Sequence, residues 1–151
     1  MATPNKTLEQ VSQGMVRADV PLASAIDAVD ACIPYQLGRY TLSGKTSGAT
    51  SIYVVPTGKK AIITAVIVRA SVATSVTSGF TFQIGANVST YDDLVSSLTT
   101  TLDAVGEYQF CLIAAGFRTA YAAASVIKFN ATSPATGTTL TLVIDIIGYL
   151  V

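Results

Sequence analysis

The stretch Leu140-Thr141-Leu142-Val143-Ile144-Asp145-Ile146 decides the fold class of this chain. Leucine or isoleucine occupies every second position, and Thr141, Val143 and Asp145 stand between them. Successive side chains of a strand point to opposite faces, so a period of two predicts a β-strand with one buried face. The stretch lies close to Val151, the last residue, and we expect it to pair in the interior of a sheet or to close a barrel.

Other parts of the chain share this strand character. Between Gly79 and Gly85, Phe80, Phe82 and Ile84 alternate with polar residues, which again predicts one buried face. Short runs rich in β-branched and aromatic residues, bounded by turn residues, predict the remaining strands. These ranges are 51–55, 61–70, 107–113 and 119–130, with a turn at Pro56-Thr57-Gly58 and an ambiguous Ala122-Ala123-Ala124 that could be helical.

Six or seven short strands separated by turns predict an all-β fold, an antiparallel β-sandwich. One short helix is expected inside it, because Thr90 can cap a helix whose first turn carries Asp92 and Asp93. Leu94, Val95 and Leu98 would then face inward. Strands of about ten residues and this inserted helix favour a jelly roll, and an immunoglobulin-like sandwich remains the alternative.

The chain is expected to divide into an N-terminal arm, residues 1–45, and a β-sandwich domain, residues 46–151. The arm shows no strand-like run, and a Gly/Ser/Thr linker at residues 43–48 follows it. Two short amphipathic helices are predicted in the arm, each too short to be stable alone. Their apolar stripes are candidate partner-binding residues: Leu8, Val11 and Met15 on the first, and Leu22, Ile26 and Val29 on the second. We expect these stripes to have one of two uses: they pack on the β-sandwich domain of the same chain, or they dock on a neighbouring subunit.

Composition excludes several classes of function. The chain of 151 residues has nine basic and nine acidic side chains and no histidine. Without histidine, Ser-His-Asp and Cys-His nucleophilic sites and the usual zinc sites are excluded. A net charge of zero gives no general attraction to nucleic acid or to anionic lipid, and no apolar run is long enough for a membrane-spanning helix. No enzyme activity, cofactor, metal or small-molecule substrate is therefore expected.

The low charge itself points to an assembly. Charged residues make up 12% of the chain, against about 25% in an average soluble domain. The polar surface must then consist largely of serine and threonine, which protects poorly against association. We expect much of this surface to be covered by other copies or by a partner. No signal-peptide core follows Met1, so the chain is expected in the cytoplasm, with Cys32 and Cys111 reduced and buried.

Three weaker patterns remain as candidate chemistry. Asp92, Asp93, Asp103 and Glu107 could meet around a calcium ion, although their spacing matches no calcium loop. Glu107 and Asp145 are the acids that a glycoside hydrolase would need on strands. The run Gly44-Lys45-Thr46 resembles the end of a phosphate loop, but Arg39 stands where the first glycine is required, so it is interpreted as a linker.

The overall pattern resembles small structural proteins of tailed phages, especially capsid decoration, or cement, proteins. The resemblance covers roughly residues 50–151. It depends on the neutral Ser/Thr/Ala-rich β-domain and on three runs: Val55-Pro-Thr-Gly-Lys-Lys-Ala-Ile-Ile-Thr-Ala-Val66, Tyr91-Asp-Asp-Leu94 and Ile144-Asp-Ile-Ile-Gly-Tyr-Leu-Val151. It implies a homotrimer on the outside of an icosahedral shell, with the major capsid protein as partner and the arm bridging neighbouring subunits. No functional residue can be transferred from this class.

The sequence therefore predicts a virion protein that is made in the host cytoplasm and stabilises a capsid from outside. Two other classes of function stay open. The first is a head-fibre, tail-fibre or receptor-binding β-module, which would be present in far fewer copies per particle. The second is a carbohydrate-active jelly-roll enzyme, which would depend on Glu107 or Asp145.

Overall fold

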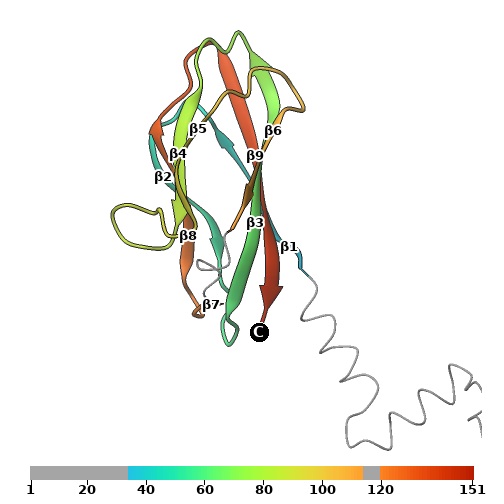
Figure 1. Cartoon of the computed structure of the whole chain (residues 1–151), viewed down its shortest axis with the longest axis vertical. Helices are drawn as coiled ribbons and strands as arrows, with labels where there is room; N and C mark the ends of the chain where they lie inside the picture. The colour runs from blue at the N-terminus through green and yellow to red at the C-terminus, as the bar shows by residue number, and fades with distance from the viewer. Residues whose placement is uncertain (1–33, 114–119) are drawn as a thin grey trace, which may run out of the picture. The chain divides into compact units, whose positions relative to one another are not determined.

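A computed structural model describes residues 34–113 and 120–151, which belong to one compact unit, Pro34–Val151. This unit is all-β, and no helix occurs among the residues described (Figure 1). None of them forms a helix that could cross a membrane. The strands are β1 (Tyr35–Ser43), β2 (Gly48–Val54), β3 (Ala61–Thr74), β4 (Phe80–Gly85), β5 (Val95–Thr100), β6 (Tyr108–Leu112), β7 (Ala120–Tyr121), β8 (Val126–Ser133) and β9 (Thr139–Leu150).

The strands form two antiparallel sheets that make a β-sandwich. One sheet has the order β1-β9-β3-β6, with the short β7 also paired to β3, and the other has the order β2-β8-β4-β5. Strand β9 lies between β1 and β3, where Leu142 is opposite both Leu42 and Ala70. This confirms the prediction that the last strand pairs in the interior of a sheet.

The pairing pattern is nested. When the two-residue β7 is left aside, the first long strand pairs with the last, β1 with β9, and the second with the last but one, β2 with β8. Inside these pairs, β3 pairs with β6 and β4 with β5. The chain therefore runs as a long antiparallel hairpin whose successive pairs alternate between the two sheets.

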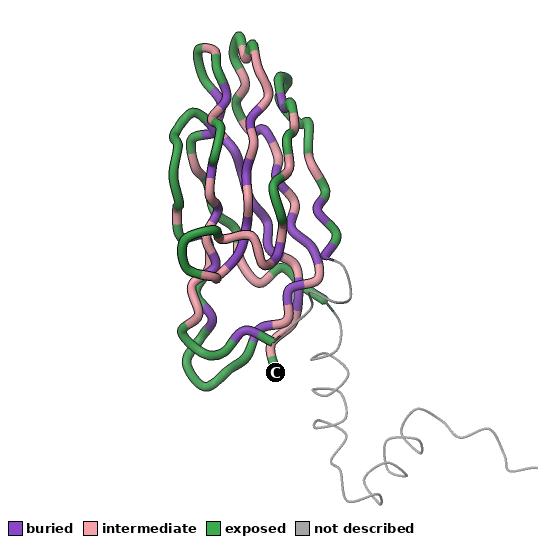
Figure 2. Tube along the Cα trace, turned by 60° about the vertical axis from the view of Figure 1, so that its left-hand side comes forward, coloured by how far each residue is buried: buried purple, intermediate pink, exposed green. Residues whose placement is uncertain are grey.

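The hydrophobic core lies between the sheets and draws side chains from both. The alternating residues of β9 that predicted a buried face, Leu140, Leu142, Ile144 and Ile146, are all at most 1% exposed. Opposite them, Phe82 stacks between Phe80 and Phe129, with ring centroids 5.4 Å and 5.0 Å away. Figure 2 shows buried residues along the strands and exposed residues in the connecting loops and on the edge strands. The expected strands at 61–70, 79–85 and 107–113 are thus confirmed.

The expected inserted helix is wrong. Residues 86–94 form a loop of turns and bends, and the strand β5 begins at Val95. Ser89 and Tyr91 have positive φ angles of 83° and 54°, which a right-handed helix does not allow. The spacing of Leu94, Val95 and Leu98 imitated one helical face, whereas Leu98 in fact pairs with Phe82 in the sheet.

The boundary expected at residue 45 also needs correction. Residues 35–43, predicted to be free of strands, form β1, in which Arg39 pairs with Asp145 of β9. The Gly/Ser/Thr run at 43–48 is the turn between β1 and β2 rather than a linker between domains. The two predicted arm helices lie outside the described residues, as do Leu8, Val11, Met15, Leu22, Ile26 and Val29.

The turn predicted at Pro56-Thr57-Gly58 is confirmed: Lys59 N–H donates to the Pro56 carbonyl at 3.2 Å, and Gly58 has a φ of 75°. The expected strand at 119–130 splits into β7 and β8. Ala122-Ala123-Ala124 forms the turn between them rather than a helix. Ser125 N–H donates to the Ala122 carbonyl at 3.1 Å there.

Truncation of Phe82 tests the core. Phe82→Ala removes a fully buried ring that touches two other rings, so we expect the free energy of unfolding to fall by about 3–5 kcal/mol. Val88→Ala is the matched control, because Val88 is 87% exposed and should change stability by less than about 0.5 kcal/mol. Urea unfolding followed by circular dichroism measures both, and equal effects would contradict this placement of the core.

Candidate functional site

One charged side chain is buried among the described residues, and it is Asp145 of β9. It lies on the outer face of the β1-β9-β3-β6 sheet. Because Leu142, Ile144 and Ile146 of β9 point into the core, Val143 and Asp145 between them point outward. Both are nevertheless only 8% exposed, although neither belongs to the central core cluster. Side chains on this outer face therefore cover the middle of β9.

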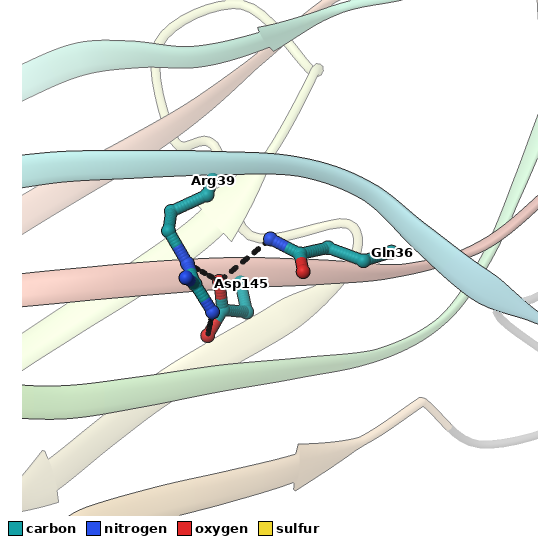
Figure 3. Close-up of polar contacts among 3 residues, drawn as sticks. All are labelled: Gln36, Arg39 and Asp145. Carbon is teal, nitrogen blue, oxygen red and sulfur yellow. Dashed lines mark hydrogen bonds and ion pairs between the residues drawn. The ribbon is translucent and has the colours of Figure 1, made fainter.

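Asp145 is held by two residues of the neighbouring strand β1, Arg39 and Gln36 (Figure 3). Arg39 Nε donates to Asp145 Oδ1 at 2.5 Å, and Arg39 Nη2 donates to Oδ2 at 3.1 Å, which is a bidentate ion pair. Gln36 Nε2 donates to Oδ1 at 3.0 Å. The hydrogen bonds and charge of Asp145 raise the pKa of Arg39 above its ordinary value. This carboxylate is thus occupied by donors, and the arrangement is suited to structure rather than proton transfer.

The two acids considered for glycoside cleavage are not brought together. Asp145 is opposite Ile67, and Ile67 is opposite Phe110, so Glu107 lies two strands across and three residues along. Strand spacing and rise then separate the two backbones by roughly 14 Å, and the Asp145 carboxylate is already bound by Arg39. Glu107 Oε2 instead accepts hydrogen bonds from the N–H groups of Asp103 and Ala104, at 2.8 and 3.2 Å.

The four acids considered for calcium occupy two separate loops, and each loop uses them for its own hydrogen bonds. No group of three acidic, histidine or cysteine side chains that could hold a metal occurs in residues 34–113 and 120–151. Asp92 accepts from Asn87 Nδ2 at 2.6 Å and from the Thr90 hydroxyl at 2.8 Å. These bonds hold the pKa of Asp92 below its ordinary value.

Asp93 fastens the loop 86–94 to the sandwich. Its Oδ1 accepts from the N–H groups of Ala86 and Asn87 at 2.6 and 3.2 Å, and its Oδ2 accepts from the Tyr121 hydroxyl at 2.9 Å. Only glycine fits at position 85, because a Cβ there would lie 1.9 Å from Asp93 Oδ1. Near the end of the loop, the Lys128 ammonium lies 4.8 Å from the centroid of the Tyr91 ring.

Lys45, in the run that resembled a phosphate loop, serves the fold. Its ammonium donates to the carbonyl oxygens of Gly137 and Thr138, the latter at 2.9 Å. The surrounding residues form a turn between two antiparallel strands, whereas a phosphate loop needs a strand followed by a helix. This lysine therefore ties the β1–β2 turn to the turn before β9.

Cys111 is a buried free thiol, as the sequence analysis expects, and Cys32 lies outside the described residues. Cys111 is 7% exposed and points inward from β6. Burial raises its pKa from 9.0 to about 11, so the thiolate is scarce at neutral pH. This thiol is not placed to act as a nucleophile.

Three exposed large apolar side chains lie together on β6, at one edge of the sandwich. Tyr108, Phe110 and Leu112 are 67, 49 and 67% exposed, and they alternate with Gln109 and Cys111. We call these three side chains the β6 patch. Beside it, a groove of about 350 Å³ runs between β5 and β6 and is lined by residues 94–98 and 109–112. Exposed apolar groups of this kind mark contact surfaces more often than catalytic ones.

Sequence reasoning found the strand at 107–113 but missed both the β6 patch and the Arg39–Asp145 pair. The alternation of Tyr108, Phe110 and Leu112 was a usable signal, but it does not reveal which face is covered. Asp145 was visible as a lone charge among apolar residues, but its partner lies 106 residues away. The candidate partner-binding residues of the arm lie outside the described residues, so the contacts assigned to them stay a prediction.

Comparison with solved structures finds phage capsids. This chain is similar to a chain of the acidic stable capsid structure of Helicobacter pylori bacteriophage KHP30, with a TM-score of 0.52 and 13% identity. The match covers 79% of this chain and 91% of that chain, and it shows a shared fold. A chain of the cyanophage Pam1 capsid asymmetric unit matches with a TM-score of 0.49 and 15% identity, covering 74% of this chain and 80% of that one. No protein-family model and no curated protein matches the sequence.

Substitution of Arg39 tests the ion pair between its half-exposed guanidinium and the nearly buried Asp145 carboxylate. Arg39→Met leaves the Asp145 carboxylate buried with only Gln36 as donor, so we expect a clear loss of stability in urea unfolding. Adding Asp145→Leu removes the stranded charge and should recover most of that loss. Lys59→Met is the matched control, because it removes the same charge from an exposed turn. If Arg39→Met and Lys59→Met had the same urea unfolding midpoint, the Arg39–Asp145 pair would make no contribution to stability.

Alkylation tests the burial of Cys111. In a Cys32→Ser variant Cys111 is the chain's remaining thiol. A pKa raised from 9.0 to about 11 lowers the thiolate fraction about a hundredfold at pH 8, and burial slows access further. We therefore expect iodoacetamide to label the folded protein at least a hundredfold more slowly than the protein in urea, as measured by mass spectrometry. Comparable rates would show that β6 opens readily.

Proposed function

We propose that this chain is a structural protein of a phage capsid and that it stabilises the coat-protein shell from outside as a decoration protein. The observation that carries the proposal is the fold similarity to a chain of the KHP30 capsid structure. The nested pairing of the eight long strands is the form of that fold in this chain. In this proposal the major capsid protein is the partner, and the chain acts as an oligomer on the virion exterior after synthesis in the host cytoplasm.

The strand order supports a jelly roll in particular. Counted without β7, the sheets have the orders 1-8-3-6 and 2-7-4-5, as in a hairpin of four nested pairs wrapped into a sandwich. An immunoglobulin-like sandwich has seven strands in a different division, so this alternative is less well supported. Jelly rolls recur in viral capsid and lectin domains. The absence of tryptophan makes the lectin-like use less favourable, because sugar platforms are commonly aromatic.

The surface supports a role in an assembly. Charged residues make up only 12% of the chain, and Arg39 and Asp145 neutralise each other on the outer face of one sheet. The β6 patch adds three exposed large apolar side chains. A surface with few charges and an apolar edge is poorly suited to a free monomer at high concentration, whereas it suits a protein that meets many neighbours.

The arm extends the proposal to neighbouring subunits. Leu8, Val11 and Met15, and then Leu22, Ile26 and Val29, fall at helical spacing in a segment that precedes β1. A segment of this length that orders on docking can wrap a large surface at an entropic cost. Because many copies bind one shell, modest contacts per copy add up to strong reinforcement.

Copy number in purified particles is the primary test. Quantitative mass spectrometry should find this chain at close to one copy per major capsid protein. A fibre, spike or receptor-binding module would instead be present in tens of copies or fewer. Absence from every particle would remove the virion proposal and bring back a screen for glycan cleavage.

Deletion of residues 2–33 tests the arm. The deletion ends there because β1 begins at Tyr35 and its pairing with β9 belongs to the sandwich. We expect the shortened protein to unfold at a urea midpoint close to that of the full chain and to bind shells at least tenfold more weakly in co-sedimentation.

Single substitutions in the full-length chain test whether shell binding depends on the apolar stripe of the arm or only on the arm being present. Ile26→Ser should weaken shell binding, whereas Asp27→Ser, one position away from the stripe, should not. Full shell binding by the shortened protein would contradict a role for the arm.

A further inference from the structure

Strand β6 has a hydrogen-bonding edge that no other described strand covers. It lies at the end of the β1-β9-β3-β6 sheet and pairs with β3 alone among the described residues. Ile113 N–H donates to the Thr64 carbonyl at 3.0 Å, so the odd-numbered residues of β6 direct their backbone groups toward β3. In an antiparallel ladder these directions alternate, which turns the N–H and C=O groups of Tyr108, Phe110 and Leu112 outward. The Phe110 carbonyl accepts only a long side-chain bond from Gln109, at 3.3 Å.

The side chains of the same three residues form the β6 patch. Exposed apolar side chains and backbone groups that pair with no other described strand therefore coincide on β6. Natural edge strands are usually protected by lysine, proline or an inward charge, and the sequence Tyr-Gln-Phe-Cys-Leu has none of these. The nearest charge along the chain, Glu107, is turned back to the N–H groups of Asp103 and Ala104. Arg69 of β3 lies opposite Tyr108, one strand in from the edge. Strand β6 itself therefore carries no charge and is apolar along its outer face.

We propose that the β6 edge is a contact between two copies of this chain, related by a two-fold axis that passes beside Phe110. In the antiparallel pairing that such an axis generates, Phe110 lies opposite Phe110 of the second copy, and Tyr108 lies opposite Leu112. Each of these pairs is also a hydrogen-bonded pair, because the outward backbone groups belong to the same residues. The two β1-β9-β3-β6 sheets then continue as one sheet across the axis.

A second copy fits this edge better than a partner of another chemistry. In the self-pairing register the outer-face pairs, Phe110 with Phe110 and Tyr108 with Leu112, each join two apolar side chains. Gln109 meets Cys111 on the other face, and no charged residue occurs along the five residues. A strongly basic or acidic partner would find no complementary charge on this strand. Residues of both β5 and β6 line one groove, so these two edge strands lie on the same side of the sandwich. A two-fold axis beside β6 would bring this side of one copy against the same side of the second copy. The other three edge strands offer less. Strand β1 includes the charged Arg39, β2 has a single exposed large apolar side chain, Val54, and β5 has none.

This inference goes beyond the proposed function and is tested without particles. The resemblance to decoration proteins implies three copies, whereas the β6 edge predicts pairs of copies. We expect the full chain to sediment as a concentration-dependent dimer at micromolar concentrations. Phe110→Lys sets two ammonium groups against each other at the axis, so the dissociation constant should rise at least tenfold. Val88→Lys, the same substitution of a valine that is 87% exposed in the loop 86–94, should leave the mass unchanged.

Charge exchange tests the register itself. Phe110→Lys and Phe110→Glu should each be monomeric alone and should form a mixed dimer when combined. Tyr108→Lys should weaken association, and adding Leu112→Glu to the same chain should restore it, because residues 108 and 112 of different copies meet. Circular dichroism checks that each variant is folded. If Phe110→Lys does not fold, the comparison of Tyr108→Lys with Tyr108→Lys/Leu112→Glu still tests the register. A monomeric full chain, a trimer whose mass is unchanged by Phe110→Lys, or mixtures that stay monomeric would overturn the proposal.

Discussion

The central position of β9 is the constraint on which the rest of the fold depends. It is paired along its length on both sides, with β1 and with β3, and its even-numbered side chains Leu140 to Ile146 fill the middle of the core. A strand in this place has neighbours on both sides. One of its faces lies on the core and must be apolar, and any charge on the other face must be paired. The bidentate bond from Arg39 makes Asp145 compatible with that second face and joins the first long strand to the last.

The parts of the fold that the sequence predicts are those in which one strand carries its own signal. The alternation in β4 and β9 is strong because both strands lie inside their sheets and have one fully apolar face. β1 was missed because Gly38, Arg39 and mixed polar residues blur its period, and β5 because Leu94, Val95 and Leu98 also fit a helix. Both are edge strands, which bury less and therefore show less pattern. Which strands are neighbours is a property of the folded chain, and it decides that Asp145 meets Arg39.

The candidate surface follows the same logic. Local sequence identifies β6 as a strand, but the exposure of Tyr108, Phe110 and Leu112 depends on its place at the end of the β1-β9-β3-β6 sheet. An identical pentapeptide in the middle of a sheet would be ordinary core. The acidic residues illustrate the converse, because Asp92, Asp93 and Glu107 look like candidate chemistry in sequence and are occupied by backbone and side-chain donors in the fold. The acids that looked reactive in the sequence thus serve the fold among the described residues.

The two faces of β6 have opposite chemical consequences. Its inward side is closed, and there the Cys111 thiol is desolvated and has a pKa near 11. Its outward side leaves backbone donors, backbone acceptors and three apolar side chains uncovered, which a soluble monomer normally avoids because such an edge recruits other strands. A chain with 12% charged residues has little electrostatic repulsion to keep copies apart. An open edge is tolerable in such a chain when a specific partner covers it, and in the proposed β6 contact the second copy is that partner.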